Sequence, residues 1–240
     1  MALTIEEAQK ITTEFARRYP VAGVELAYKI RYTLAELYGP FASQMPQSTK
    51  GGYVPKQGVT DDGKPYNGIV HIVLNNNTDR KDLIATLQHE VFGHHGINTL
   101  STADRNAFVA SIIESRNEPS LRHFWDYALK NYSDRDLEEQ AEEVFARQCE
   151  DCEVSRHLFH TQAENVLKAI KNSGTQSFFE TCINRTRPMR QKDLFNIARM
   201  VALGLQDGSR TQQHFPQDHT QLAVNPIKRK RISKNRDFER

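Results

Sequence analysis

Residues 87–96 read Leu-Gln-His-Glu-Val-Phe-Gly-His-His-Gly and contain the residue types of a hydrolytic zinc site. Neutral imidazoles, here His89 and His94, bind the metal, and a neighbouring carboxylate, here Glu90, takes a proton from the water that the metal activates. The common His-Glu-x-x-His motif places its histidines on one helix face, but His89 and His94 are five residues apart, about 140° round a regular helix. A π-bulge of about 4.4 residues per turn brings positions i and i+5 into register. Because Gly93 lacks a Cβ and can relax the turn, we expect a π-bulge here.

A strand is expected directly before this helix. Residues 68–74, Gly-Ile-Val-His-Ile-Val-Leu, have the β-branched density of a strand, and residues 75–78 supply a turn and an N-cap for a helix over 79–94. Upstream, residues 39–68 are rich in Gly, Pro, Asn, Asp and Ser, which indicates turns and short strands. Apolar periodicity predicts further helices over residues 5–19, 102–115, 119–131, 134–150, 153–172 and 190–205. Residues 24–37 are expected to form a helix-like or mixed segment.

A second acidic motif, Glu142-Glu143-Val144-Phe145-Ala146, lies on one of these predicted helices. His-Glu-x-x-Gly-His followed by Glu-Glu-x-x-Ala resembles the zinc site of the dipeptidyl peptidase III family, in which the active-site helix accommodates one inserted residue. The resemblance implies that Glu143 is the third zinc ligand and that Glu142 contacts the ligands without binding the metal itself. Glu138 and Glu139 form a rival acidic pair, although acidic helix positions are usually just solvated.

The wider pattern over roughly residues 50–150 also resembles the small zincin-like metallopeptidase domains of polyvalent proteins of phages and plasmids. This resemblance implies a mobile-element protein that hydrolyses peptide bonds of a host protein or of its own particle. Zinc held by His89, His94 and Glu143 would activate a water, and Glu90 would act as its base. The predicted strand over 68–74 offers an edge along which an extended peptide could pair.

Other roles in such a site stay open at this point. A group that stabilises an oxyanion is expected, and the candidates are His95, Tyr132, Arg147 and His157. Two imidazoles and one carboxylate suit Zn²⁺, without separating it from manganese or cobalt. His95 is expected to support the site or to lie at the surface rather than to bind the metal.

Three cysteines are too few for a disulfide scaffold, which fits a reducing compartment. Cys149 and Cys152 precede His157 and His160, but this order lacks the long spacer of a zinc finger, so we expect incidental thiols on helices.

Charge is unevenly distributed along the chain of 240 residues. Lys and Arg total 32 against 30 acidic residues, yet seven of the basic residues crowd into positions 228–240. Such a tail is usually solvated, but it could contact phosphates or act as a targeting patch. The sequence shows neither a signal peptide nor an apolar run long enough to span a membrane, so we expect a cytoplasmic protein.

Together these features predict an α+β, mostly helical fold, in which a small sheet packs on the metal-binding helix in zincin fashion. We expect a metallopeptidase domain over residues 1–150, a helical subdomain over 151–206 and a basic, loosely ordered tail over 207–240. The predicted function is that of a zinc-dependent peptidase, more readily an endopeptidase than an exopeptidase because the chain is far too short for dipeptidyl peptidase III. The alternative is a non-catalytic module of the same fold that recognises a protein partner or nucleic acid.

Overall fold

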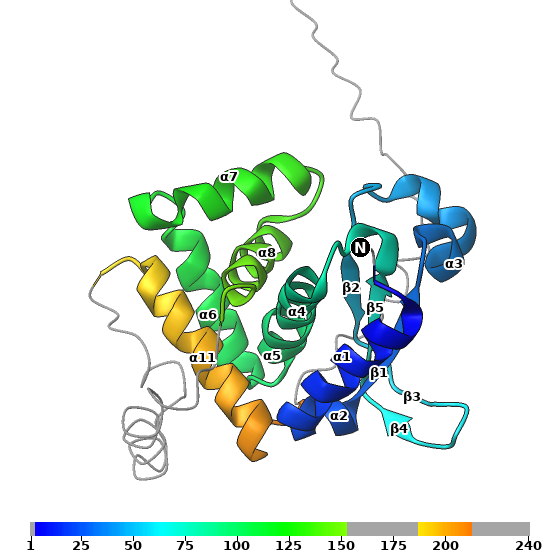
Figure 1. Ribbon diagram of the computed structural model, residues 1–240. Helices are drawn as coiled ribbons and strands as arrows, with labels where there is room; N and C mark the ends of the chain where they lie inside the picture. The colour runs from blue at the N-terminus through cyan, green and yellow to red at the C-terminus, as the bar shows by residue number, and fades with distance from the viewer. Residues whose placement is uncertain (1–2, 153–186, 213–240) are drawn as a thin grey trace, which may run out of the picture.

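The computed structural model describes residues 3–152 and 187–212 (Figure 1). These residues form a mostly helical α+β fold with a small mixed sheet, which confirms the predicted fold class at this level. Helix α4 and the segment after it run through the middle, with the sheet, α1 and α2 on one side and α6, α7, α8 and α11 on the other (Figure 1). No helix in these described ranges is both long and apolar enough to cross a membrane.

The main sheet has three strands in the order β1-β5-β2. β1 (Leu26–Arg31) pairs parallel with β5 (Gly68–Val73), and β2 (Gly51–Val54) pairs antiparallel with the other edge of β5. All six residues of β5 are buried, as expected for a central strand with neighbours on both sides. The expectation that this strand offers a free edge to a peptide is therefore wrong, because β1 and β2 occupy both of its edges. A separate hairpin joins β3 (Gly58–Val59) to β4 (Pro65–Tyr66).

The N-terminal helix forms as its sequence predicts. α1 (Ile5–Arg18) begins with a capping box in which Thr4 Oγ1 accepts from the Glu7 amide and the Glu7 carboxylate accepts from the Thr4 amide. The next segment, predicted over 24–37 as helix-like or mixed, is helical only at its two ends. The chain there forms the end of α2 (Pro20–Glu25), then β1, then α3 (Leu34–Tyr38), because pairing with β5 outweighs local helix propensity.

The metal motif follows β5 directly. A short helical turn η2 (Leu74–Asn76) leads into α4 (Arg80–Gln88), which is capped by Asp79 and continues into η3 (His89–His95) and α5 (Gly96–Asn98). The later helices lie close to their predicted places: α6 (Thr102–Glu114), the short η4 (Pro119–Leu121) with α7 (Arg122–Asn131), α8 (Leu137–Cys149) and α11 (Gln191–Asp207). A short 3-10 helix, η1 (Gly39–Gln44), lies at the start of the segment for which turns and short strands are predicted.

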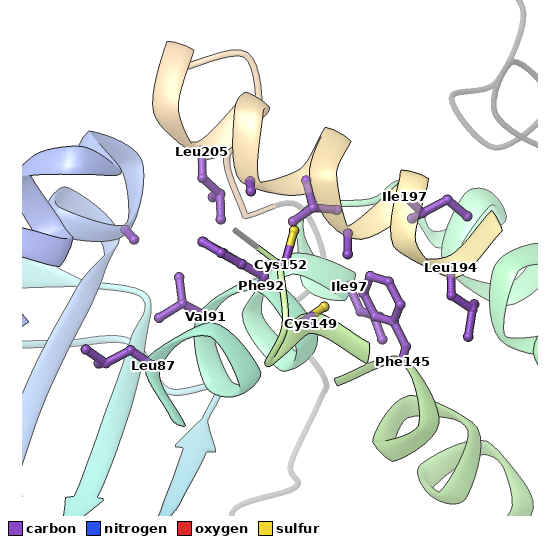
Figure 2. Packing of buried hydrophobic residues seen from close by; sticks show 14 of the residues in the cluster. Leu87, Val91, Phe92, Ile97, Phe145, Cys149, Cys152, Leu194, Ile197 and Leu205 are labelled. Carbon is purple, nitrogen blue, oxygen red and sulfur yellow. The ribbon is translucent and has the colours of Figure 1, made fainter. Parts of the chain in front are cut away.

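One hydrophobic cluster connects these elements. Val91 and Phe92 of the metal-binding segment, Phe145 of α8, and Leu194 and Ile197 of α11 all belong to it. Figure 2 shows α11 crossing over the segment that carries Phe92 and over the end of α8. The predicted helix over 153–172 and the basic residues of the tail lie outside the described residues, and the division into three parts stays a prediction.

Candidate metal centre

The predicted π-bulge is confirmed. Residues His89–His95 form a π-helical stretch, η3, between α4 and α5. The additional residue in this turn brings His89 and His94 to one face, where their Nε2 atoms are 3.3 Å apart. Both side chains are mostly buried but keep some access to solvent, with 14% and 18% of their surface exposed. The chain thus prepares two imidazole ligands within a single helix.

Glu143 of α8 faces both imidazoles. Its Oε2 lies 3.5 Å from His89 Nε2, and its Oε1 lies 3.4 Å from His94 Nε2. A tetrahedral zinc with ligands at about 2.0–2.1 Å holds neighbouring ligand atoms about 3.3 Å apart. Each of these separations is close to the edge of a zinc coordination tetrahedron, and the two histidines face different oxygens of the Glu143 carboxylate.

Glu90 lies on the same stretch and offers the second carboxylate. The ligand atoms of His89, Glu90 and His94 lie within 4.8 Å of one another, a looser set than the one closed by Glu143. Glu90 is 4% exposed, and its Oε2 has no hydrogen-bond partner in the described part of the chain. Burial raises its pKa. A buried carboxylate beside two histidines, with one oxygen that has no hydrogen-bond partner in the described part of the chain, suits a proton acceptor better than a structural residue.

Two small residues set the distance between η3 and α8. A Cβ built on Gly93 would lie 2.5 Å from Ala146 Cβ and 2.6 Å from Ala146 Cα. Gly93 therefore does more than relax the turn, since it also allows α8 to approach closely enough for Glu143 to reach the histidines. The glycine of the first motif and the alanine of the second contact each other, which gives a physical reason for both.

A supporting carboxylate that the sequence did not reveal completes the cluster. Glu150, at the end of α8, accepts a hydrogen bond from His89 Nδ1 at 3.0 Å and one from Arg147 at 2.8 Å. A proton held on Nδ1 leaves Nε2 free for a metal, which is the usual arrangement of metal-binding histidines. Glu150 follows Glu143 by two helical turns on the same face, and this spacing is the signal that could have identified it.

The charges of the cluster are strongly coupled. Burial lowers the pKa of His89, but its hydrogen bonds to Glu143 and Glu150 outweigh burial, so the net pKa is well above the usual value. The pKa of His94 is raised by the Glu143 carboxylate against the same effect of burial. Burial favours the neutral form of Glu143, yet the positive charge of His94 and the hydrogen bonds from both histidines hold its pKa below the usual range. Without a metal, the cluster thus keeps protons that a metal would displace.

Other candidates for the site lie apart from it. Glu142 forms an ion pair with Arg105 of α6, so it turns away from the histidines. Glu139, of the rival pair, lies 3.7 Å from Arg135 on the outer side of α8, and its neighbour Glu138 is exposed.

The remaining candidates are divided between the cluster and the core. Tyr132 lies beside Glu143, and burial followed by the Glu143 charge raises the pKa of its phenol. Arg147 contacts Glu150 and lies over the ring of Tyr127, with its guanidinium carbon 4.4 Å from the ring centroid. His95 is fully buried on the opposite side of η3, 3.3 Å from Glu25. His157 lies outside the described residues.

The two described cysteines are buried in the apolar core rather than gathered at a metal. Figure 2 shows Cys149 and Cys152 among Phe92, Phe145 and the residues of α11. Burial raises the pKa of both thiols, that of Cys152 to about 12. Protonated buried thiols are poor metal ligands, so these positions match the incidental thiols that the sequence suggested.

Comparison with known proteins gives one strong similarity. The chain is 47% identical over 217 residues to DNA primase TraC of Escherichia coli. The aligned region covers 90% of this chain but only 14% of that protein, so the chain corresponds to a small part of a much longer relative. No protein-family model matches the chain. No solved structure matches it either.

This similarity overturns the predicted function. The identification of the chain as a zincin-like metallopeptidase, related to the phage and plasmid domains or to dipeptidyl peptidase III, is wrong, and so is the predicted hydrolysis of peptide bonds. The expected protein or peptide substrate loses its support for the same reason, because the similar protein is a DNA primase. The motif identifies groups that can hold and use a metal, but these groups do not specify which substrate meets them.

Proposed function

We propose that this chain is a zinc-binding domain that serves DNA priming, in a protein related to DNA primase TraC. The observation that carries the proposal is the 47% identity over 90% of the chain, which includes both motifs of the metal cluster. The ligands are His89, His94 and Glu143, and the cofactor is Zn²⁺. Bound zinc would fix η3 against α8 and would supply a Lewis acid next to Glu90.

The donor set argues against this cluster as the centre that joins nucleotides. Nucleotidyl transfer uses Mg²⁺, which prefers oxygen ligands in octahedral geometry. His89 and His94 supply nitrogen ligands, and their distances to each other and to the two Glu143 oxygens are close to those between ligand atoms around a tetrahedral ion. The relative has most of its length outside the region aligned with this chain. We therefore assign nucleotide addition to another part of such proteins, and metal binding with contact to the DNA template to this part.

We propose three further properties of this chain. The packing of η3 on the small sheet is zincin-like in architecture, without the peptidase activity. The basic tail over 228–240 adds electrostatic contacts to nucleic acid. The site of action is the cytoplasm.

Two measurements on the purified full chain test the function. Elemental analysis after dialysis should find about one zinc per chain, and fluorescence anisotropy should detect binding of a labelled oligothymidylate. A primer-synthesis assay with ribonucleotides on single-stranded template should give no product from this chain alone. Absence of oligonucleotide binding at low salt would contradict the DNA role, and primer synthesis by the isolated chain would contradict the assignment of nucleotide addition elsewhere.

A further inference from the structure

A groove lies between α1 and β1, away from the metal cluster. Its cavity has a volume of about 520 Å³ and is lined by residues of α1, β1 and the hairpin of β3 and β4. β1 is the edge strand on one side of the sheet, whereas the strand that contacts η3 from the other edge is β2. The groove and the metal cluster therefore occupy different parts of the fold.

The ionisable side chains at this groove that can carry charge near neutral pH are all cationic. Arg17 of α1, Arg31 at the end of β1 and Lys64 from the hairpin line it, and all three are exposed. None of the described lining residues is acidic. Glu14, the acidic residue of α1 nearest in sequence to Arg17, pairs first with Arg80 at 2.6 Å and acts on Arg17 only as a weaker charge from outside the lining. Cations from three separate elements thus converge on one groove.

The floor of the groove adds features that suit a nucleotide chain. Thr12 is 5% exposed, and its Oγ1 has no hydrogen-bond partner within the described ranges. Tyr28 gives the groove an aromatic side chain from β1. Proteins that bind single-stranded nucleic acid combine cations along the phosphate chain with aromatic surfaces for the bases.

We propose that the α1–β1 groove binds the phosphate chain of single-stranded DNA, with Arg17, Arg31 and Lys64 as the phosphate contacts. The inference rests on the DNA role proposed above and adds the surface that carries it. The basic tail of this chain is a poor occupant because like charges repel it from the groove. An acidic protein segment is the competing occupant, and the experiment separates it from DNA.

The test uses the full chain, a fluorescein-labelled oligothymidylate and a series of NaCl concentrations. The groove variant is Arg17→Gln/Arg31→Gln/Lys64→Gln. The control variant, Arg116→Gln/Arg122→Gln/Lys130→Gln, removes the same charge from exposed positions on α7 and in the link between α6 and α7. Circular dichroism and thermal melting check that both variants fold.

We expect the groove variant to bind at least about tenfold more weakly than wild type and its salt slope to fall by about 2, since each phosphate contact on a single strand contributes about 0.7. The control should change affinity by less than about threefold. The single change Arg17→Gln, at an exposed side chain, should weaken binding by about threefold and serves if the triple variant does not fold.

Three results would overturn the inference, each in a different way. Equal losses in groove and control variants would mean a general charge effect. Loss only after Lys228–Arg231 are changed to Gln would move the DNA site to the tail and leave the proposed function intact. Displacement of the oligonucleotide by polyglutamate at lower concentration than by unlabelled oligothymidylate would indicate an acidic protein partner. A wild-type chain that binds no oligonucleotide would contradict the proposed function itself.

Discussion

In the metal cluster, ionisable side chains from η3 and α8 converge within 3.3–3.5 Å and are largely buried, whereas in the α1–β1 groove three cations stay exposed and no described lining residue is acidic. The first arrangement neutralises charge internally and suits a small ion that replaces protons. The second leaves its positive charge exposed, with Glu14 and Asp62 acting on Arg17 and Lys64 from outside the lining, and suits an extended polyanion, whose binding weakens with salt. In these two regions the degree of convergence, more than the number of charges, separates the proposed ion site from the proposed polyelectrolyte surface.

Glu143→Ala should change the metal cluster most strongly while leaving the groove unaffected. Removing one of three ligands from a site with a binding free energy of about 12 kcal/mol should weaken zinc binding by about 1,000-fold. Competition with a chromogenic chelator measures this change, and Glu138→Ala, on the exposed side of the same helix, is the control. Oligothymidylate affinity should stay within about threefold of wild type. A parallel loss of DNA affinity would show that the two regions are not independent.

His71 lies on β5, the central strand of the sheet, between β1 at the groove and β2 beside η3. Its burial makes the stability of this sheet sensitive to acid. Burial, reinforced by the charge of Lys29, lowers its pKa from 6.5 to about 4. Between pH 6.5 and pH 4, His71 is therefore protonated in the unfolded chain but neutral in the folded chain. As a result, the free energy of unfolding falls by about 3 kcal/mol as the pH drops from 6.5 to 4. Urea unfolding at pH 7 and pH 4 should show a smaller loss for His71→Gln than for wild type. An unchanged loss would place the acid sensitivity in other groups.

Gly93→Ala tests the packing that closes the metal cluster. The added Cβ would overlap Ala146, so α8 must move, at a cost of about 2 kcal/mol, and Glu143 should shift away from the histidines. Thermal unfolding and zinc affinity should both decrease. Because the nearest contact is Ala146 Cβ, adding Ala146→Gly should recover part of each loss. No recovery in the double variant would mean that Gly93 acts through the turn alone.

Glu150→Gln should give the smallest effect, about a tenfold loss of zinc affinity, since supporting groups of metal-binding histidines contribute on that scale. The amide can still contact His89 Nδ1 but carries no charge. Asp151→Asn, at the next and exposed position, is the matched control. If Glu150→Gln and wild type bind zinc with equal affinity, the role of Glu150 is restricted to its ion pair with Arg147 and does not extend to the metal.

Much of the fold followed from local patterns. Apolar periodicity and the capping box located α1, α6, α7, α8 and α11 within a few residues. The segment over residues 24–37 could not be assigned in this way, because β1 is a strand only through its pairing with β5. The short strands before β5 depend on the same partner or on each other.

The function could not be predicted from the same residues, because a motif describes the groups that meet a metal and leaves the substrate open. The two histidines and Glu90 indicated metal chemistry. The similarity to a DNA primase then replaced the predicted peptidase function with a proposed role in DNA priming.

The sequence by itself determined that His89 and His94 meet on one face, because five residues and one π-helical turn fix their relative positions through local backbone angles. The tertiary structure alone decided that Glu143 and Glu150 reach these histidines, and that Arg17, Arg31 and Lys64 share a groove. Residues far apart in the chain are brought together by core packing, here by Gly93 against Ala146 and by α1 over β1, and no local pattern encodes those distances.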